Sequence, residues 1–286
     1  MWDGLSSVPA WRQTKVRPTC INLLWSDFAG KGLDHGRWFK IQGHRQPILA
    51  MASQPNRQMA LQALDNPIWQ SLLTCHSDFA IGNEQVKRYP SAIGPFIAVP
   101  SEEAVEETYL SGIVAAGETL YFVGVAPRLS AQWQLTEHGP IVQMLCPSQI
   151  EVAENDTRIS ILSETDIPAM MELTALVYPE YFRARTSDLG TYLGISLNGR
   201  LAAMAGERMY LTGHQEISAV CTHPDFTGRG FAARLVSRLT NAILERNEIP
   251  FLHVSRDNER AKSLYERLGF IARRELRMWA VTAKSI

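Results

Sequence analysis

Hydrophobic and polar positions follow a regular pattern in the second half of the chain. Short apolar runs predict β-strands at residues 158–162, 192–197, 200–204, 216–222, 250–255 and 270–281. Helices are predicted between them, from 163 to about 177, over 229–246 and over 259–268. The second of these helices carries a single apolar stripe, formed by Ala232, Leu235, Val236, Leu239 and Ile243. This mixture of strands and helices indicates an α/β (α+β) domain.

Two local signals support these boundaries. Asn198 and Gly199 separate two apolar runs, and this pair favours a tight type I′ hairpin because both residues tolerate a positive φ. Ser163 followed by Asp166 resembles a capping box, in which each side chain satisfies a free backbone N–H of the other residue. We therefore predict a hairpin at 198–199 and a helix start near 163.

The first half has a weaker pattern. It predicts a helix over 57–73 that is interrupted near Pro67, strands over 85–99, 120–125 and 141–145, and a helix that begins after Ser101 and runs to about 113. The polar segment 147–157 has no clear period and is interpreted as a boundary. The predicted division is a poorly structured lead-in at 1–31, an N-terminal α/β domain at 32–150 and a second domain at 151–286.

Composition excludes several classes of function. Lys and Arg total 28 against 29 Asp and Glu, so no excess of positive charge favours nucleic acid or an anionic membrane. No apolar run approaches the ~20 residues of a membrane span, and the N-terminus has no signal-peptide core. Four dispersed cysteines and seven histidines form no metal-binding spacing. We expect a cytoplasmic protein without a metal, and leave open whether it forms a homodimer.

The segment 220–232 carries the strongest chemical signal. A strand ends, Pro224 follows, and a short loop with Gly228 and Gly230 leads into a helix. The free N–H groups and the positive end of the helix dipole then converge on one point, where glycines let a phosphate approach the backbone. A Gly-x-Gly pair at a helix start also occurs in ordinary tight turns, so this loop alone does not decide the function.

Two motifs together resemble the GCN5-related N-acetyltransferases. The loop Thr227-Gly228-Arg229-Gly230-Phe231-Ala232 is similar to that family's (Arg/Gln)-x-x-Gly-x-(Gly/Ala) motif, with Thr227 in place of the usual Arg or Gln. The segment 258–270 is similar to its Asn-x-x-Ala-x-x-Leu-Tyr-x-x-x-Gly-Phe motif. The order of predicted elements after 158 also agrees, and the C-terminal half most resembles the FR47-like and glycine N-acyltransferase-like branch. The first half carries no motif of the family.

The resemblance implies a fold and a co-substrate. The fold is a mixed central sheet, flanked by helices, in which two parallel strands splay apart; here these are 216–222 and 250–255. Acetyl-CoA or another acyl-CoA then binds with its pantetheine along the opened edge and its pyrophosphate at the glycine loop. Val220, Cys221, Thr222 and Asn258 are assigned to the pantetheine, and Gly228, Arg229, Gly230, Phe231, Ala232 and Ala233 to the pyrophosphate. Asn258 also suits a helix N-cap.

The chemistry requires a proton donor for the thiolate and an acceptor for the amine proton. The resemblance implies that Tyr265 is the general acid. It places the general base at Glu216, whose pKa we expect partial burial to raise toward neutrality; Glu207 is the alternative, and water is a third. Cys221 is interpreted as a packed thiol rather than a nucleophile.

The acceptor is expected over the loop 178–186. Tyr181, Arg183 and Arg185 suit a flat or carboxylate-bearing small molecule, although arginines in a loop are often simply solvated. The leading hypothesis is transfer of an acetyl group to a primary amine of a small molecule or amino acid. An acyl-CoA-binding regulator and a protein N-acetyltransferase remain alternatives. The first half is either a degenerate copy of the same fold or an acceptor or dimerisation domain.

Overall fold

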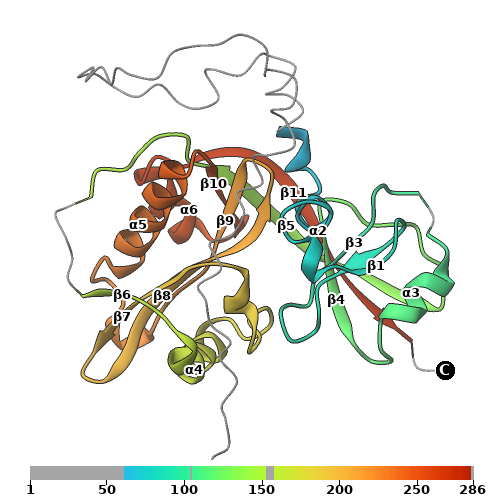
Figure 1. The fold of residues 1–286 in the computed structure, drawn as a ribbon, viewed down its shortest axis with the longest axis horizontal. Helices are drawn as coiled ribbons and strands as arrows, with labels where there is room; N and C mark the ends of the chain where they lie inside the picture. The colour runs from blue at the N-terminus through green and yellow to red at the C-terminus, as the bar shows by residue number, and fades with distance from the viewer. Residues whose placement is uncertain (1–60, 104, 153–157, 285–286) are drawn as a thin grey trace, which may run out of the picture. The chain divides into compact units, whose positions relative to one another are not determined.

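The computed structural model describes residues 61–103, 105–152 and 158–284, and its largest feature is an eight-stranded mixed sheet (Figure 1). The strand order is β4-β11-β5-β10-β9-β8-β7-β6. These strands are β4 (Thr119–Val123), β5 (Trp133–Leu145), β6 (Ile159–Ile161), β7 (Tyr192–Leu197), β8 (Arg200–Leu211), β9 (His214–Thr222), β10 (Ile249–Ser255) and β11 (Ile271–Ala283). A separate small sheet contains β1 (Ile81–Gly82), β2 (Lys87–Arg88) and β3 (Ile97–Ala98).

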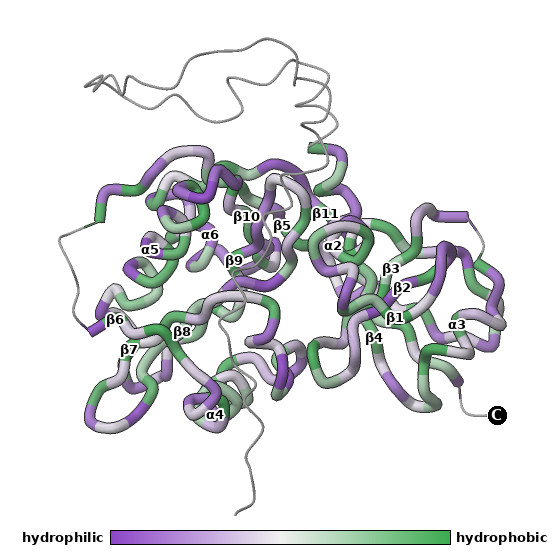
Figure 2. The backbone as a smooth tube through the Cα atoms, in the orientation of Figure 1, coloured by the Kyte–Doolittle hydropathy of each residue, from purple (hydrophilic) through white to green (hydrophobic). Residues whose placement is uncertain are grey.

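Helices cover both faces of the large sheet. On one face, α5 (Phe231–Glu245) and α6 (Glu259–Arg267) contribute Leu235, Leu239 and Tyr265 to a buried cluster with the strands. On the other face, α4 (Ile167–Val177) packs Met170 and Leu173 against the sheet. Figure 2 shows apolar and polar positions alternating along α5, as its predicted stripe requires. The remaining helical segments are α2 (Pro67–Leu73), α3 (Glu107–Ile113), and the 3₁₀ turns Ser77–Phe79, Glu164–Asp166, Thr186–Leu189 and Pro224–Phe226.

The local signals in the second half are confirmed. Asn198 and Gly199 have φ of 53° and 75°, which gives the tight hairpin between β7 and β8. The capping box of Ser163 and Asp166 is formed in both directions. In the first half, the predicted interruption near Pro67 is confirmed, because a turn precedes α2, which begins at Pro67. The start of that predicted helix, 57–60, and the lead-in 1–31 lie outside the described residues.

Three predictions in the first half were wrong in extent. The strand expected over 85–99 is reduced to the two-residue strands β2 and β3, with a turn between them. Helix α3 begins at Glu107 and not after Ser101, because the Ser101 hydroxyl accepts a hydrogen bond from the nearby N–H of Glu103 in a turn. Strand β5 covers thirteen residues, Trp133–Leu145, where only 141–145 was expected. Polar, exposed residues alternate along its first part, so the sequence does not resemble a buried strand. That part nevertheless pairs with β11, with one register shift at His138.

The parallel strands β9 and β10 pair only at their beginnings. Ile249, Pro250 and Phe251 pair with His214, Gln215 and Glu216, and no parallel pairing follows. Beyond that point β9 pairs with β8 alone and β10 with β5 alone. A bulge at Ala219, whose φ is 51°, turns β9 further at the same place. The sequence-based prediction of two splayed parallel strands is therefore confirmed.

The strand between β10 and β11 comes from the first half of the chain. β5 pairs antiparallel with both, and β4 pairs with the outer edge of β11. The two predicted domains thus share one sheet. Where their boundary lies, and whether the first half is a degenerate copy of the second, remain predictions.

Candidate functional site

The glycine loop has the geometry that a bound phosphate needs. Gly228 and Gly230 have φ of 78° and 72°, a region that favours glycine, and open space surrounds the position of a side chain at each. Gly230 is the N-cap of the fifteen-residue helix α5. From Gly228 to Ala233, no backbone N–H donates to a backbone acceptor among the described residues. Six donors and the helix dipole are thus available to an anion.

Arginines surround this loop. The Arg229 guanidinium lies 5.3 Å from the Phe226 ring, and those of Arg158 and Arg234 lie 5.8 and 5.7 Å from the Phe231 ring. Thr227, which departs from the family motif, turns its hydroxyl back to the Pro224 carbonyl oxygen. Positive charge at the loop therefore comes from neighbouring residues, as suggested for Arg229, and not from position 227.

The opened edge of β9 carries the residues predicted for pantetheine. Val220, Cys221 and Thr222 lie beyond the last parallel pair, where β9 has lost its partner β10. The Cys221 thiol is buried, and burial raises its pKa to about 12. A thiol with that pKa is protonated at neutral pH, so Cys221 is unsuited to nucleophilic attack.

Tyr265 lies in α6 and its phenol is directed into the same region. Burial raises its pKa, and the nearby Tyr178 and Cys221 raise it further. The phenol is therefore neutral and able to donate a hydrogen bond. Asn258 caps α6, with its side-chain oxygen accepting from the N–H of Ala261 at 3.1 Å. That N-cap is the structural role considered from the sequence, and contact with pantetheine remains a prediction.

Glu216 differs from its expected state. Its buried carboxylate accepts two hydrogen bonds from Arg208, at 2.8 and 2.7 Å, and one from Nδ1 of His253 at 2.8 Å. Burial alone would raise the pKa of this carboxyl, but Arg208 and His253 outweigh it and the pKa falls to about 2. The expectation of a pKa raised toward neutrality was wrong, because burial here comes with a counter-charge. Glu216 is held as a carboxylate that binds a proton weakly.

This ion pair belongs to a row of polar side chains across five neighbouring strands. The Gln143 side-chain amide donates to Nε2 of His253 at 3.0 Å, while its carbonyl oxygen accepts from Arg273 at 2.9 Å. With Nε2 accepting from Gln143, Nδ1 of His253 is the atom that donates to Glu216. The row runs from β11 through β5, β10 and β9 to Arg208 on β8, and it fixes the orientation of the Arg208 guanidinium.

Glu207, the alternative base, has its own partners. Its carboxylate accepts from Arg246 at 2.7 Å and from the backbone N–H of Thr191 at 3.1 Å. The side chain is buried and Arg246 is 38% exposed. Glu207 and Glu216 are therefore both ion-paired, and neither is left free as a base.

The loop 178–186 contributes aromatic rings more than charges. Tyr181 lies 4.9 Å from the ring of Tyr121, 5.3 Å from that of Tyr178 and 6.0 Å from that of Phe96. By contrast, Arg185 pairs with Asp188 in its own loop at 2.8 Å, and Arg183 donates to the Phe182 carbonyl oxygen. Of the residues predicted for the acceptor, Tyr181 packs among these rings, and Arg183 lies close enough to Tyr121 for its charge to act on that phenol. A role of Tyr181, Arg183 and Arg185 in binding the acceptor remains a prediction.

Several residues of this region were not selected from the sequence. Phe96 and Tyr121 come from the first half of the chain, and the Arg208 guanidinium lies 4.6 Å from the Phe96 ring. Tyr178 lies near Ser218 of β9, whose side chain acts to lower the pKa of its phenol. One available signal was Arg208 itself, which with Glu207 puts charge in the middle of a largely apolar strand, where charged residues seldom occur without a partner.

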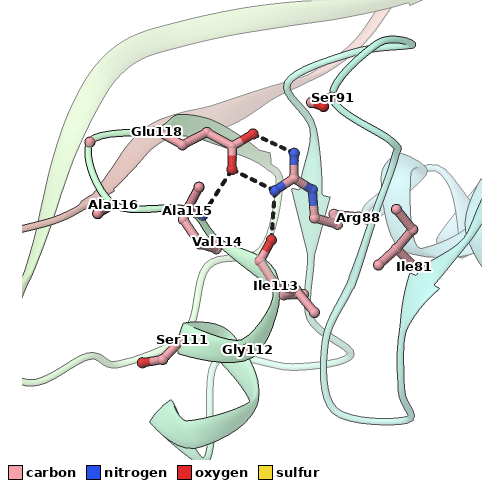
Figure 3. A pocket seen from close by; sticks show the side chains of 11 residues that line it. Ile81, Arg88, Ser91, Ser111, Gly112, Ile113, Val114, Ala115, Ala116 and Glu118 are labelled. Atoms are coloured by element: carbon pink, nitrogen blue, oxygen red, sulfur yellow. Dashed lines mark hydrogen bonds and ion pairs between the residues drawn. The ribbon is translucent and has the colours of Figure 1, made fainter.

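A surface depression elsewhere does not belong to this site. It has a volume of about 750 Å³ and is lined by residues between Ile81 and Glu118 (Figure 3). Within it, Arg88 donates to both carboxylate oxygens of Glu118 and to the carbonyl oxygens of Tyr89 and Ile113. Its charged groups are thus occupied by structural contacts, so we place the chemistry at the splayed strands.

Among the described residues, 61–103, 105–152 and 158–284, no group of three His, Cys, Asp or Glu side chains is arranged to hold a metal ion. No helix in this part of the chain is long and apolar enough to cross a membrane.

Comparison with known proteins agrees with the geometry. The family model for FR47-like protein matches residues 192–280. The structure is similar to a crystal structure of a Novosphingobium aromaticivorans protein assigned to the GNAT family of acetyltransferases. The two share 33% identity with a TM-score of 0.71, over 78% of this chain and 99% of the other. The chain belongs to the GNAT family.

Other comparisons are more distant. A GNAT protein from Kribbella flavida shares 14% identity over 78% of this chain and 94% of its own, with a TM-score of 0.48. No curated protein matches the sequence. Membership of the GNAT family gives this chain the fold of acyl-CoA-dependent N-acyltransferases.

Proposed function

We propose that the protein transfers an acetyl group from acetyl-CoA to a primary amine of a small molecule or amino acid. One observation carries this proposal. The opened edges of β9 and β10 lie next to the glycine loop and close to the phenols of Tyr178 and Tyr265. Backbone donors for a phosphate, an unpaired strand edge for two amides, and a phenol for a thiolate thus occur together.

Each part of the site has a separate task. The loop 228–233 holds the pyrophosphate, and Val220, Cys221 and Thr222 present backbone groups to the pantetheine. The Tyr265 phenol donates to the sulfur as the thiolate departs. Because burial raises its pKa, we assign the Tyr265 phenol chiefly a hydrogen-bonding role toward the sulfur. When the phenol gives its proton to the thiolate, it regains one from solvent.

Attack by the amine is direct. Cys221 is protonated and buried, so a route through an acyl-cysteine is disfavoured. With Glu216 paired to Arg208 and Glu207 to Arg246, we infer that the amine proton leaves through water. Glu216 acts as a positioning residue, since its ion pair orients the Arg208 guanidinium beside the Phe96 ring.

A panel of amines tests this function. Purified protein with acetyl-CoA is incubated with amino acids, simple amines, polyamines and peptides, and free CoA is measured by reaction of its thiol. We expect release with at least one small amine or amino acid. Release with peptides alone supports a protein N-acetyltransferase. Tight binding of acetyl-CoA with no release from any acceptor supports an acyl-CoA-binding regulator. A cytoplasmic location and a homodimer remain predictions.

A further inference from the structure

Tyr192 carries a buried hydroxyl without a partner. Its side chain is 2% exposed, and the hydroxyl forms no hydrogen bond with any described residue. Buried polar groups are nearly always satisfied in folded proteins, so an orphan of this kind calls for an explanation. Since Tyr192 lies on the α4 face of the sheet, two strands from the splayed strand β9, a bound ligand is one explanation.

The sheet determines where this hydroxyl points. Tyr192 pairs with Gly206 of β8, and Gly206 pairs with Ser218 of β9, so the three residues form one row across the sheet. A Cβ on Gly206 would lie 2.3 Å from the Tyr192 ring, which shows that the ring lies flat across the glycine. The hydroxyl therefore extends over β8 toward β9, where Ser218 lies near Tyr178.

Arg208 offers a second unused donor in the same region. Its Nε and Nη2 atoms both donate to Glu216, and the Phe96 ring covers the guanidinium at 4.6 Å. The Nη1 group has no hydrogen-bond partner in the described part of the chain, although only 11% of the Arg208 side chain is exposed. The polar row from β11 to β8 keeps this group in place.

Together these groups place neutral donors beside the Arg208–Glu216 ion pair. Tyr178 and Tyr192 have pKa values raised by burial, so both phenols are neutral donors, and each is close enough to Arg208 to respond to its charge. A guanidinium edge and a neighbouring phenol match the two oxygens of a carboxylate. Tyr178 also raises the pKa of Tyr265, so Tyr178 lies near both Arg208 and the residue expected at the acyl end of the site.

We propose that Arg208, through Nη1, and Tyr192, through its hydroxyl, bind the carboxylate of the acceptor. The acceptor is then an amino acid or another amine with a carboxylate a few atoms from the nitrogen. Its amine lies toward Tyr178, Cys221 and Tyr265. This inference rests on the proposed N-acyltransferase function, and it moves carboxylate recognition away from Arg183 and Arg185.

The substitution Tyr192→Phe tests the site without removing a contact that holds the fold. Wild type and variant are assayed with amino acids and with the matching amino-acid amides, which lack the carboxylate. We expect the variant to raise KM for the amino acids about tenfold or more, since it loses a hydrogen bond to a charged group. KM for the amides should stay within about twofold, and the melting temperature should not fall.

Thr240→Val is the matched control, because Thr240 on α5 also carries a buried hydroxyl without a partner. It should leave both KM values unchanged. Amides used as well as amino acids by wild type, or an equal change in both KM values in Tyr192→Phe, would overturn the proposal.

A binding measurement separates this inference from the proposed function. If no acceptor releases CoA, the proposed enzyme fails, but amino acids can still be tested as ligands of the CoA-loaded protein. A rise in melting temperature with amino acids, absent with the amides and absent in Tyr192→Phe, supports the carboxylate site. No rise in wild type with any amino acid contradicts it.

Discussion

Replacing Glu216 by Gln distinguishes a buried anchor from a catalytic base. The carboxylate holds Arg208 and His253, and the pKa of Glu216 falls from 4.5 to about 2 in the folded protein. At about 1.36 kcal/mol per pKa unit, this corresponds to about 3 kcal/mol of stability at pH 7. The neutral amide of the variant would leave Arg208 buried without its counter-charge, a change that typically costs about 3–5 kcal/mol. A melting temperature lower by roughly 6–12 °C follows for a chain of this size.

The pH dependence has a definite sign. A carboxyl whose folded pKa is depressed stabilises the protein above its unfolded pKa and loses that contribution as the pH falls through the folded value. For Glu216 the window runs from about pH 4.5 down to 2, and about half of the contribution is lost at pH 3. The stability gap between wild type and Glu216→Gln should therefore narrow steadily across this range.

Urea unfolding at several pH values from 7 to 3 measures this gap. Glu207→Gln is the matched control on the neighbouring strand, where the partner Arg246 is 38% exposed, and we expect a smaller loss of stability. The reasoning is refuted if Glu216→Gln is as stable as wild type at pH 7. Activity lost in such a stable variant, and recovered at high pH, would restore Glu216 as the general base.

Three further substitutions test other parts of the site. Gly230→Glu places bulk and negative charge where the phosphates should lie, so calorimetry should show no acetyl-CoA binding; Gly117→Glu, which has a similar φ of 74° in another loop, should bind normally. Tyr265→Phe should keep CoA affinity while kcat falls about 10²- to 10⁴-fold, and an unchanged kcat would remove Tyr265 from the mechanism. Gly206→Ala should cost about 1–3 kcal/mol in urea unfolding, because the new Cβ meets the Tyr192 ring at 2.3 Å; equal stability would show that the ring moves freely.

The sequence predicted those parts of the fold that depend on neighbouring residues. Asn198-Gly199 fixes its hairpin through local φ angles, and the loop at Gly228 and Gly230 precedes a helix whose apolar stripe is evident. The motif containing Tyr265 places that residue on α6 in the same way. Each of these features lies within one short segment, so a single sequence is enough to detect it.

The acceptor side could not be predicted because it depends on register between distant strands. Tyr192, Gly206 and Ser218 lie in one row only because β7, β8 and β9 pair in this register, which no single short segment specifies. Likewise, the pKa expected for Glu216 considered burial without the counter-charge of Arg208. The first half was the hardest part to predict. Exposed polar residues alternate along β5, and no motif marks Phe96, whose ring contacts the Arg208 guanidinium.

The most direct test of the account is the balance between CoA and product. Protein, acetyl-CoA and the best amine from the panel are incubated, and free CoA and the N-acetylated amine are quantified together by mass spectrometry. Direct transfer predicts one amide for each CoA released, with both lost in Gly230→Glu. Tight acetyl-CoA binding without any amide, across amino acids, simple amines and peptides, would contradict the proposal that this chain is an N-acyltransferase.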